Sequence, residues 1–174
     1  MKRLFIGLSI AKQQREQIAQ WRQQALSDNS GELFKSVDKD NFHITLSFIG
    51  SISADKITPL IAAMNKTLKP KCSIDLNRLD CWPKPKVLFL HASSVQENLL
   101  TLATNIIETV KHNNIHQEDR PYIPHLTLCR KAKHAPIITE AFNFKLDFQQ
   151  CHLYESISSN QGVQYKIIHT WPLN

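Results

Sequence analysis

A short alternating segment, residues 41–50, constrains the fold more than any other part of the sequence. It reads Asn-Phe-His-Ile-Thr-Leu-Ser-Phe-Ile-Gly. Large apolar residues fall at every second position, which is the period of a β-strand with one buried face. These apolar positions are Phe42, Ile44, Leu46 and Phe48. Because residues two apart on a strand share a face, the pattern predicts that His43, Thr45 and Ser47 lie together on the opposite face.

The same unit returns in the second half of the chain, where residues 123–130 read Ile-Pro-His-Leu-Thr-Leu-Cys-Arg. His125 and Thr127 repeat the His-x-Thr-Leu pattern in the same apolar frame. A single copy is typical of a half-exposed polar strand face. Two copies, one in each half of a 174-residue chain, instead predict two related lobes whose histidine-bearing strands line one cleft.

Two histidines beside two threonines are suited to acid–base chemistry on a small anion. The ordinary pKa of histidine is ~6.5, so one ring can donate a proton while another accepts one. A threonine hydroxyl can donate a hydrogen bond to a phosphate oxygen. The two motifs are too alike for the residues alone to say which histidine is the acid.

The bulk composition fits one globular domain spanning residues 1–174, with 42% hydrophobic residues. The net charge is +6 and the isoelectric point is about 9.2, which favours an anionic partner such as RNA. Four cysteines without a Cys-x-x-Cys pair predict free thiols in a reducing cytoplasm. No apolar run approaches a membrane span, so we expect a cytoplasmic protein without membrane contact.

Periodicity along the chain predicts an α+β fold. It comprises two pseudo-symmetric lobes of antiparallel sheet, with helices on the outer faces and a central cleft. A third helix is expected to begin at a capping box, Ser94 to Glu97, and to give way to a mobile polar loop over 111–120. Helical spacing predicts the other two helices, and alternation or apolar runs predict the strands. The helices are expected at 11–26 and from Ser53 onward, and the strands at 3–10, 41–50, 72–80, 87–90, 123–130, 142–149, 153–157 and 161–171.

The paired His-x-Thr-Leu motifs resemble those of the two-histidine phosphoesterase superfamily. Within it, the chain is similar to the bacterial and archaeal RNA 2′,3′-cyclic phosphodiesterases, also called 2′-5′ RNA ligases. The resemblance extends to the opening Arg-Leu-Phe-Ile-Gly-Leu at 3–8, to Tyr-Glu-Ser at 154–156 and to residues 165–172. It therefore covers almost the whole chain, and the two motifs are its most specific part.

The resemblance implies a substrate, a chemistry and a set of site residues. The substrate would be an RNA ending in a 2′,3′-cyclic phosphate, either tRNA-like or an oligonucleotide, and the product a 2′-phosphate. His43 would be the proton donor and His125 the proton acceptor, with Thr45, Thr127 and Arg130 binding the substrate. The family pattern implies no metal, no cofactor and no protein partner, and we expect a monomer.

Two details test this assignment against strand geometry. Strict alternation puts Arg130 opposite His125, so Arg130 can reach the substrate only from the strand end or through a β-bulge. Tyr122, which precedes the second motif, is a candidate for stacking on a base. Phe42 and Phe48 are expected to be packed.

Other functions remain open on the residues alone. His112 and His116 have the i, i+4 spacing of a helical metal-ligand pair, although zinc needs three or four ligands. A non-catalytic RNA-binding module would use Lys131 and Lys133 for backbone contacts. The same acid–base pair would also serve reversible 2′-5′ joining of RNA ends, or opening of a cyclic phosphate on a small nucleotide.

Overall fold

The computed structural model describes residues 1–27, 34–117, 121–160 and 162–174. Their strands form two four-stranded sheets and one two-stranded sheet, and every pairing is antiparallel. The first sheet has the order β10 (Gly162–Pro172), β9 (Gln150–Ser159), β1 (Lys2–Ser9), β3 (His43–Ile52). The second has the order β2 (Lys35–Ser36), β7 (His125–Arg130), β6 (Val87–His91), β5 (Arg78–Trp82). The small third sheet pairs β4 (Cys72–Leu76) with β8 (Phe144–Phe148).

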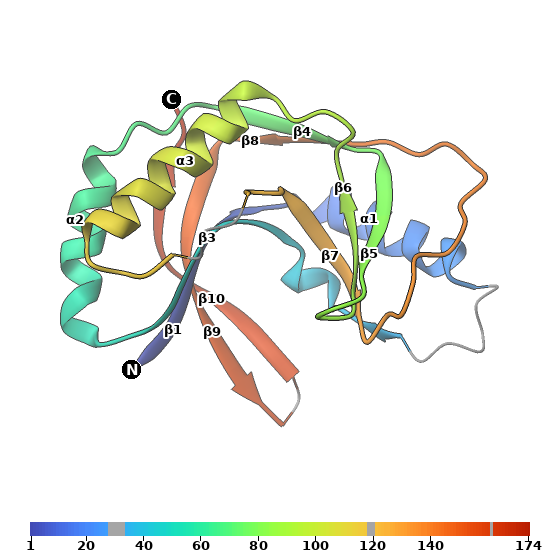
Figure 1. Ribbon diagram of the computed structural model, residues 1–174, viewed down its shortest axis with the longest axis horizontal. Coiled ribbons are helices and arrows are strands. Elements are labelled where there is room, and N and C mark those ends of the chain that lie inside the picture. The colour runs from blue at the N-terminus through green and yellow to red at the C-terminus, as the bar shows by residue number, and fades with distance from the viewer. Residues whose placement is uncertain (28–33, 118–120, 161) are drawn as a thin grey trace.

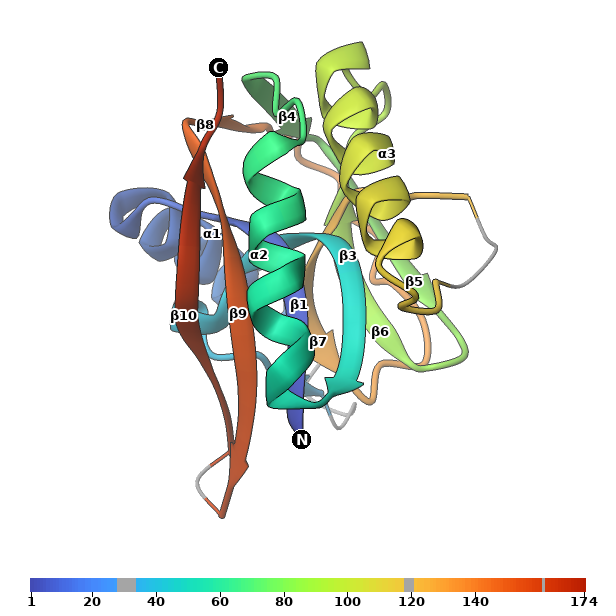
Figure 2. The ribbon, with the colours of Figure 1, turned by 90° about the vertical axis from the view of Figure 1, so that its left-hand side faces the viewer.

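The helices lie at opposite ends of this arrangement (Figure 1). The helix α1 (Lys12–Ala25) lies at the end that holds the second sheet, whereas α2 (Ile57–Lys66) and α3 (Glu97–His112) lie together at the other end. Figure 2 shows α2 and α3 running side by side with β3 behind them. Two short 3₁₀ turns, η1 (Lys39–Asn41) and η2 (Ala54–Lys56), precede β3 and α2. This is the predicted α+β architecture, with a helix-bearing lobe on each side of a central cleft.

The helices form where the sequence places an apolar stripe at helical spacing. Ile18 is the buried residue of α1, and Leu60 and Met64 are those of α2. The longer stripe of α3 buries Leu99, Leu102, Ala103, Ile106 and Val110. These side chains and the inner faces of the strands form one contiguous hydrophobic cluster. The two lobes therefore share a core. None of the helices described is long and apolar enough to cross a membrane.

Two local predictions are wrong. The expected strand at 72–80 is two strands, because the chain turns at Asn77 and its halves join different sheets. The second half, β5, pairs with β6 as an antiparallel hairpin. The helix α3 begins at Glu97 with Gln96 as its N-cap and no side-chain capping bond, so the capping box does not form. Part of the loop predicted at 111–120 lies outside the described residues; α3 itself continues to His112.

The motif strand β3 departs from simple alternation at two bulges. Pairing with β1 skips Leu46, between Thr45 and Ser47, and skips Ile49, between Phe48 and Gly50. Each extra residue shifts the phase of the strand by one position. Phe42 is buried as expected, with 3% of its surface exposed, but Phe48 is 55% exposed and Ile49 takes a buried position at 5%. The prediction that Phe48 is packed is therefore wrong.

Candidate active site

His43 begins β3 and is held at both ring nitrogens. Its Nδ1 lies 2.7 Å from the carbonyl oxygen of Asn41, and its Nε2 lies 3.0 Å from the hydroxyl of Thr45. A carbonyl oxygen can only accept, so Nδ1 carries the proton and donates. In the neutral ring, Nε2 then accepts from the Thr45 hydroxyl. The lone pair of Nε2 and the threonine hydroxyl therefore meet at one point.

Aromatic rings surround the half-buried imidazole of His43. The ring centroids of Phe5 and Tyr165 lie 4.8 Å and 5.0 Å from its own. Tyr154 stacks on Phe5 at 4.9 Å, and its centroid lies 6.4 Å from that of His43. Burial in this setting lowers the pKa of His43 to about 4; the Asn41 carbonyl opposes the shift, and the positive charges of His125 and Arg130 add to it. At neutral pH the ring is therefore uncharged in the unliganded protein.

His125 begins β7 and repeats the geometry of the first motif. Its Nδ1 donates to the carbonyl oxygen of Ile123 at 2.8 Å. The rings of Trp82 and Phe89 meet it edge-on, with centroids 4.6 Å and 5.6 Å away. Each motif histidine thus has its Nδ1 fixed by the backbone two residues earlier and its ring fixed by aromatic neighbours. In both, Nε2 is the nitrogen presented for chemistry.

The two motif strands belong to different sheets yet approach one another across the cleft. Thr45 of β3 and His125 of β7 line the same cavity. The polar faces of β3 and β7 therefore look toward a common space, as predicted.

The two threonines occupy corresponding positions with different surroundings. Thr45 is buried, with 8% of its surface exposed, and its carbonyl oxygen accepts a hydrogen bond of 3.0 Å from the hydroxyl of Tyr122. Thr127 is half-buried and pairs with Phe89 on β6. Since Phe89 contacts the His125 ring and cross-strand partners share a face, Thr127 lies on the same side of the sheet as His125.

A bulge in β7 turns Arg130 toward the cleft. Phe89 pairs with Thr127 and Leu88 with Cys129, so Leu128 is an extra residue. Leu128 and Cys129 are both buried, which breaks the alternation that runs from His125 to Thr127. The phase shift returns Arg130 to the face of His125, opposite Val87. This is the bulge that the strand geometry required of Arg130 if it is to act in the site.

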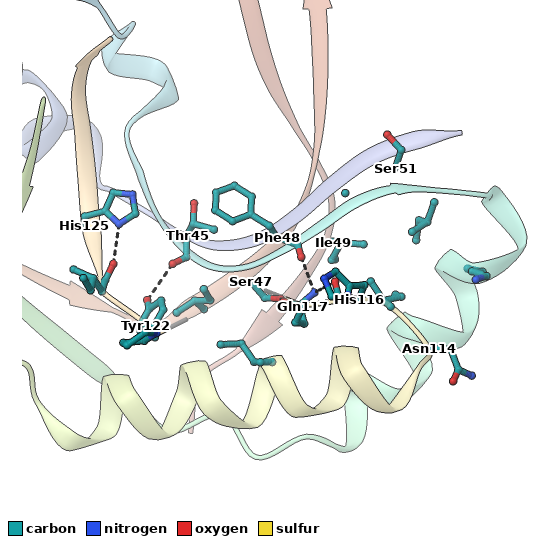
Figure 3. A pocket seen from close by; sticks show the side chains of 18 of the residues that line it. Thr45, Ser47, Phe48, Ile49, Ser51, Asn114, His116, Gln117, Tyr122 and His125 are labelled. Carbon is teal, nitrogen blue, oxygen red and sulfur yellow. Dashed lines mark hydrogen bonds between the residues drawn. The ribbon is translucent and has the colours of Figure 1, made fainter. Parts of the chain in front are cut away.

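A cavity of about 720 Å³ opens from this centre. Of the five predicted site residues, Thr45 and His125 line it. From them it runs along β3 to the end of α3 and the segment that follows α3, as Figure 3 shows. Gln117 joins the walls: its amide nitrogen donates to the Phe48 carbonyl at 2.7 Å, and its amide oxygen accepts from the Ser47 hydroxyl at 2.7 Å.

The sequence reasoning missed three residues of this cavity: Phe48, Trp82 and Gln117. Phe48 was assigned to the core because the bulges of β3 leave no trace in the alternation. Trp82 lies just beyond the strand expected at 72–80, and no role was predicted for it. Gln117 carries no local signal, since its role depends on a strand 69 residues away.

The alternative of a histidine metal site finds no support in the described part of the chain. There, no three residues among His, Cys, Asp and Glu are grouped as metal ligands would be. His112 instead donates from Nδ1 to the Glu108 carbonyl within its own helix, at 2.7 Å. All four cysteines are outside disulfide bonds, and three of them are buried.

Two histidine strands of matching geometry, facing one cleft with a threonine beside each histidine, define the class of two-histidine phosphoesterases. Comparison with known proteins gives the same class: residues 8–89 match the family model described as LigT-like phosphoesterase. The chain is therefore similar to this LigT-like phosphoesterase family.

Two named relatives align over almost the whole chain. An Escherichia coli protein named RNA 2′,3′-cyclic phosphodiesterase is 28% identical over 99% of this chain and 97% of its own length. One of the same name from Methanocaldococcus jannaschii is 26% identical over 97% and 99%. The crystal structure of E. coli LigT complexed with 3′-AMP superposes with a TM-score of 0.90 at 28% identity, covering 99% of this chain and 98% of that one.

Proposed function

We propose that this protein is an RNA 2′,3′-cyclic phosphodiesterase, which hydrolyses a terminal 2′,3′-cyclic phosphate to a 2′-phosphate without a metal ion. The observation that carries the proposal is the pair of histidines on facing strands, His43 and His125, each with Nδ1 bonded to a backbone carbonyl. Relatives that share its fold over the whole chain carry this activity in their names. The shared core supports one catalytic domain, residues 1–174, and that this domain acts as a monomer is part of the proposal.

In the proposed reaction, water attacks phosphorus and the bond from phosphorus to the 3′ oxygen breaks. His125 takes the proton of the attacking water, and His43 gives a proton to the departing 3′ oxygen. The product keeps its phosphate on the 2′ oxygen. Facing strands suit this step, because the attacking and leaving oxygens lie on opposite sides of phosphorus. Each proton transfer is worth ~10²–10⁴-fold in rate.

The lowered pKa of His43 makes substrate binding part of the mechanism. A ring with a pKa of about 4 is neutral at pH 7. To give a proton from Nε2, however, the His43 ring must carry a proton on both nitrogens and is then positively charged. A bound phosphate places negative charge beside the ring, and an opposite charge at this range raises a histidine pKa. We therefore assign the protonation of His43 to the substrate complex, so the donor is charged only when a leaving oxygen is present.

The remaining site residues have roles that fit a phosphate anion. Thr45 and Thr127 each supply a hydroxyl on the face of their histidine. Arg130, turned to the same face by the bulge, offers a two-pronged, permanently charged grip on phosphate oxygens. Such charge-assisted bonds are about twice as strong as neutral ones. Arg130 would compensate the negative charge that builds up during displacement.

The cavity beside Thr45 and His125 offers a place for the terminal nucleoside. Its volume of about 720 Å³ lies within the range of small-molecule sites. Phe48 exposes its ring there, while Gln117 and Ser47 add polar groups. A flat apolar ring can stack on any base, which fits an enzyme that reads the phosphate more than the base. In this arrangement Phe48, rather than Tyr122, is the stacking residue.

The experiment that tests this function follows the end group of a short RNA. Wild-type protein is incubated in EDTA with an oligonucleotide ending in a 2′,3′-cyclic phosphate, and the position of the remaining phosphate is read by mass and by phosphatase sensitivity. Conversion to a 2′-phosphate supports the proposal. A 3′-phosphate product, an unchanged cyclic end, or turnover that needs an added divalent metal would overturn it.

A further inference from the structure

A row of exposed lysines lies around the end of β7, the strand that carries His125 and Arg130. Two of them stand directly before β6 and directly after β7, and the other three lie on β2, in the β5–β6 turn and in the segment that follows β7. The set, called the basic rim below, consists of Lys35, Lys84, Lys86, Lys131 and Lys133. Every one of these residues is exposed. The rim lies on the β2–β7–β6–β5 sheet, near the β5–β6 turn in Figure 1.

Strand register shows how the basic rim joins the catalytic centre. Arg130 pairs with Lys35 on one side and with Val87 on the other. Cross-strand partners share a face of the sheet, so Lys35 stands beside Arg130 on the cleft side. The backbone of Lys86 is tied to the turn after β7, because its carbonyl accepts from the amide of Ala132 at 3.2 Å. The lysines before β6 and after β7 are thereby held next to one another.

Among the described residues, no carboxylate lies within ion-pair distance of a lysine of the basic rim. In the part of the chain that the structure describes, ion pairs within 4.0 Å involve three other cations, Lys2, Arg15 and Lys39. Five uncompensated charges on one lip create a positive potential that attracts polyanions. Such a potential costs free energy in an unliganded protein through mutual repulsion, which a bound polyanion would relieve.

The cavity wall and the β9–β10 side of the cleft have no comparable group of lysines among the described residues. Among the described residues that line the cavity, Lys56 is the sole lysine or arginine. Across the cleft, the β9–β10 hairpin presents to the His43 side the face that carries Tyr154 and Tyr165. The neighbouring cross-strand pairs on that face are uncharged: Tyr165–Ser156 and Val163–Ser158. An RNA backbone leaving the site therefore finds phosphate partners on one side.

We propose that the basic rim binds the backbone phosphates of the RNA strand upstream of the cyclic end, so that the protein favours oligonucleotides over cyclic mononucleotides. This inference rests on the proposed function and adds the path of the RNA across the surface. A mononucleotide fills the catalytic centre and the cavity alone. A longer strand gains the phosphate contacts of the rim, which release condensed counterions and depend on salt.

The test pairs two double variants that remove the same charge. The rim variant is Lys84→Gln with Lys133→Gln. Lys86 and Lys131 are left in place because their φ angles of 65° and 64° would mix backbone strain with the loss of charge. The control variant is Lys66→Gln with Lys71→Gln, at the end of α2 and just before β4, away from the β5–β6 turn (Figure 1). Both variants leave the same net charge.

KM is measured for a cyclic mononucleotide and for a single-stranded oligonucleotide with a cyclic end, over a range of salt. For the rim variant we expect KM of the oligonucleotide to rise on the order of tenfold at 0.1 M salt. The slope of log KM against log salt falls by about 1.4, which is two contacts at 0.7 each for a single strand. KM of the mononucleotide stays unchanged, and the control variant behaves as wild type.

Two results would overturn the proposal that the basic rim binds RNA. One is an unchanged KM for the oligonucleotide in the rim variant, and the other is an equal change of KM in the rim and control variants. Failure of the proposed function is a separate outcome, since it removes wild-type turnover of both substrates. In that case the role of the basic rim is tested with the same variants by measuring their affinity for a labelled single-stranded RNA by fluorescence anisotropy. Weaker binding in the rim variant alone supports it, and equal binding in all three proteins refutes it.

Discussion

His43 and His125 each donate the Nδ1 proton to the carbonyl oxygen of the residue two positions earlier, at 2.7 Å and 2.8 Å. This shared geometry fixes the tautomer of both rings and presents Nε2 of each. The environments then differ: His43 lies among Phe5 and Tyr165, and burial lowers its pKa to about 4. The two histidines therefore have the same backbone hydrogen bond but different surroundings, which suits one of them to donate a proton and the other to accept one.

Burial of a neutral His43 predicts a specific loss of stability in acid. The pKa of His43 in the folded protein lies below the ordinary value of ~6.5. Below pH 6.5, therefore, His43 binds a proton in the unfolded chain but stays neutral in the folded protein. Stability then falls by up to about 1.4 kcal/mol per pH unit as the pH drops toward 4. His43→Gln lacks this contribution.

Urea unfolding of wild type and His43→Gln at pH 7 and pH 5 measures it. The stability advantage of wild type over the variant should shrink by about 1–2 kcal/mol at the lower pH. His152, whose pKa is also lowered by burial, is present in both proteins and cancels. An advantage that is the same at both pH values contradicts a depressed His43 pKa.

The bulge at Leu128 predicts that Arg130 acts on both the phosphate and His43. Arg130→Gln removes a positive charge that depresses the His43 pKa, so that pKa should rise in an NMR titration of the ring proton. Loss of a charge-assisted phosphate contact, worth about 1.5–3 kcal/mol, should lower kcat/KM for a cyclic mononucleotide by about 10- to 100-fold. Arg78→Gln, on β5 of the same sheet, serves as the control. Equal behaviour of the two variants would remove Arg130 from the site.

Substitutions of Phe42 and Phe48 should have different effects, because Phe42 packs in the core and Phe48 is exposed in the cavity. Phe42→Ala empties a core position and should destabilise the protein by about 3–5 kcal/mol. Phe48→Ala removes an exposed ring and should change stability by less than about 0.5 kcal/mol. If a base stacks on Phe48, its loss costs about 1–3 kcal/mol of binding, seen as a 5- to 150-fold higher KM. A KM equal to wild type would leave the cavity without a stacking role.

The division of labour between the histidines is open to a leaving-group experiment. In a cyclic substrate whose bridging 3′ oxygen is replaced by sulfur, the departing thiolate needs no proton. His43→Gln should then be nearly as active as wild type on the sulfur substrate, while it is ~10²–10⁴-fold slower on the oxygen substrate. His125→Gln should be slow on both. The reverse pattern would exchange the two roles.

Much of the site could be predicted because its signals are local. Alternation within each His-x-Thr-Leu unit predicts which residues share a strand face. The apolar stripes of α1, α2 and α3 predict the buried side of each helix. The two-copy spacing further indicates two lobes. None of these inferences needs the partner strand.

What the sequence could not show depends on residues far apart in the chain. Each bulge is a mismatch between two strands, so Leu46 and Ile49 look like ordinary members of an alternating run. The exposure of Phe48 and the cleft-facing direction of Arg130 both follow from such mismatches. The split of 72–80 into β4 and β5 is likewise set by their partners, β8 and β6.

The central claim is that two histidines on facing strands act on one phosphate without a metal. Single-turnover hydrolysis of an RNA with a 2′,3′-cyclic end, measured in EDTA for wild type, His43→Gln and His125→Gln, tests it most directly. The account predicts turnover to a 2′-phosphate by wild type and a loss of ~10²–10⁴-fold in each variant. Circular dichroism verifies that each variant is folded. Full activity in a folded variant of either histidine, or a wild-type rate abolished by EDTA, would contradict it.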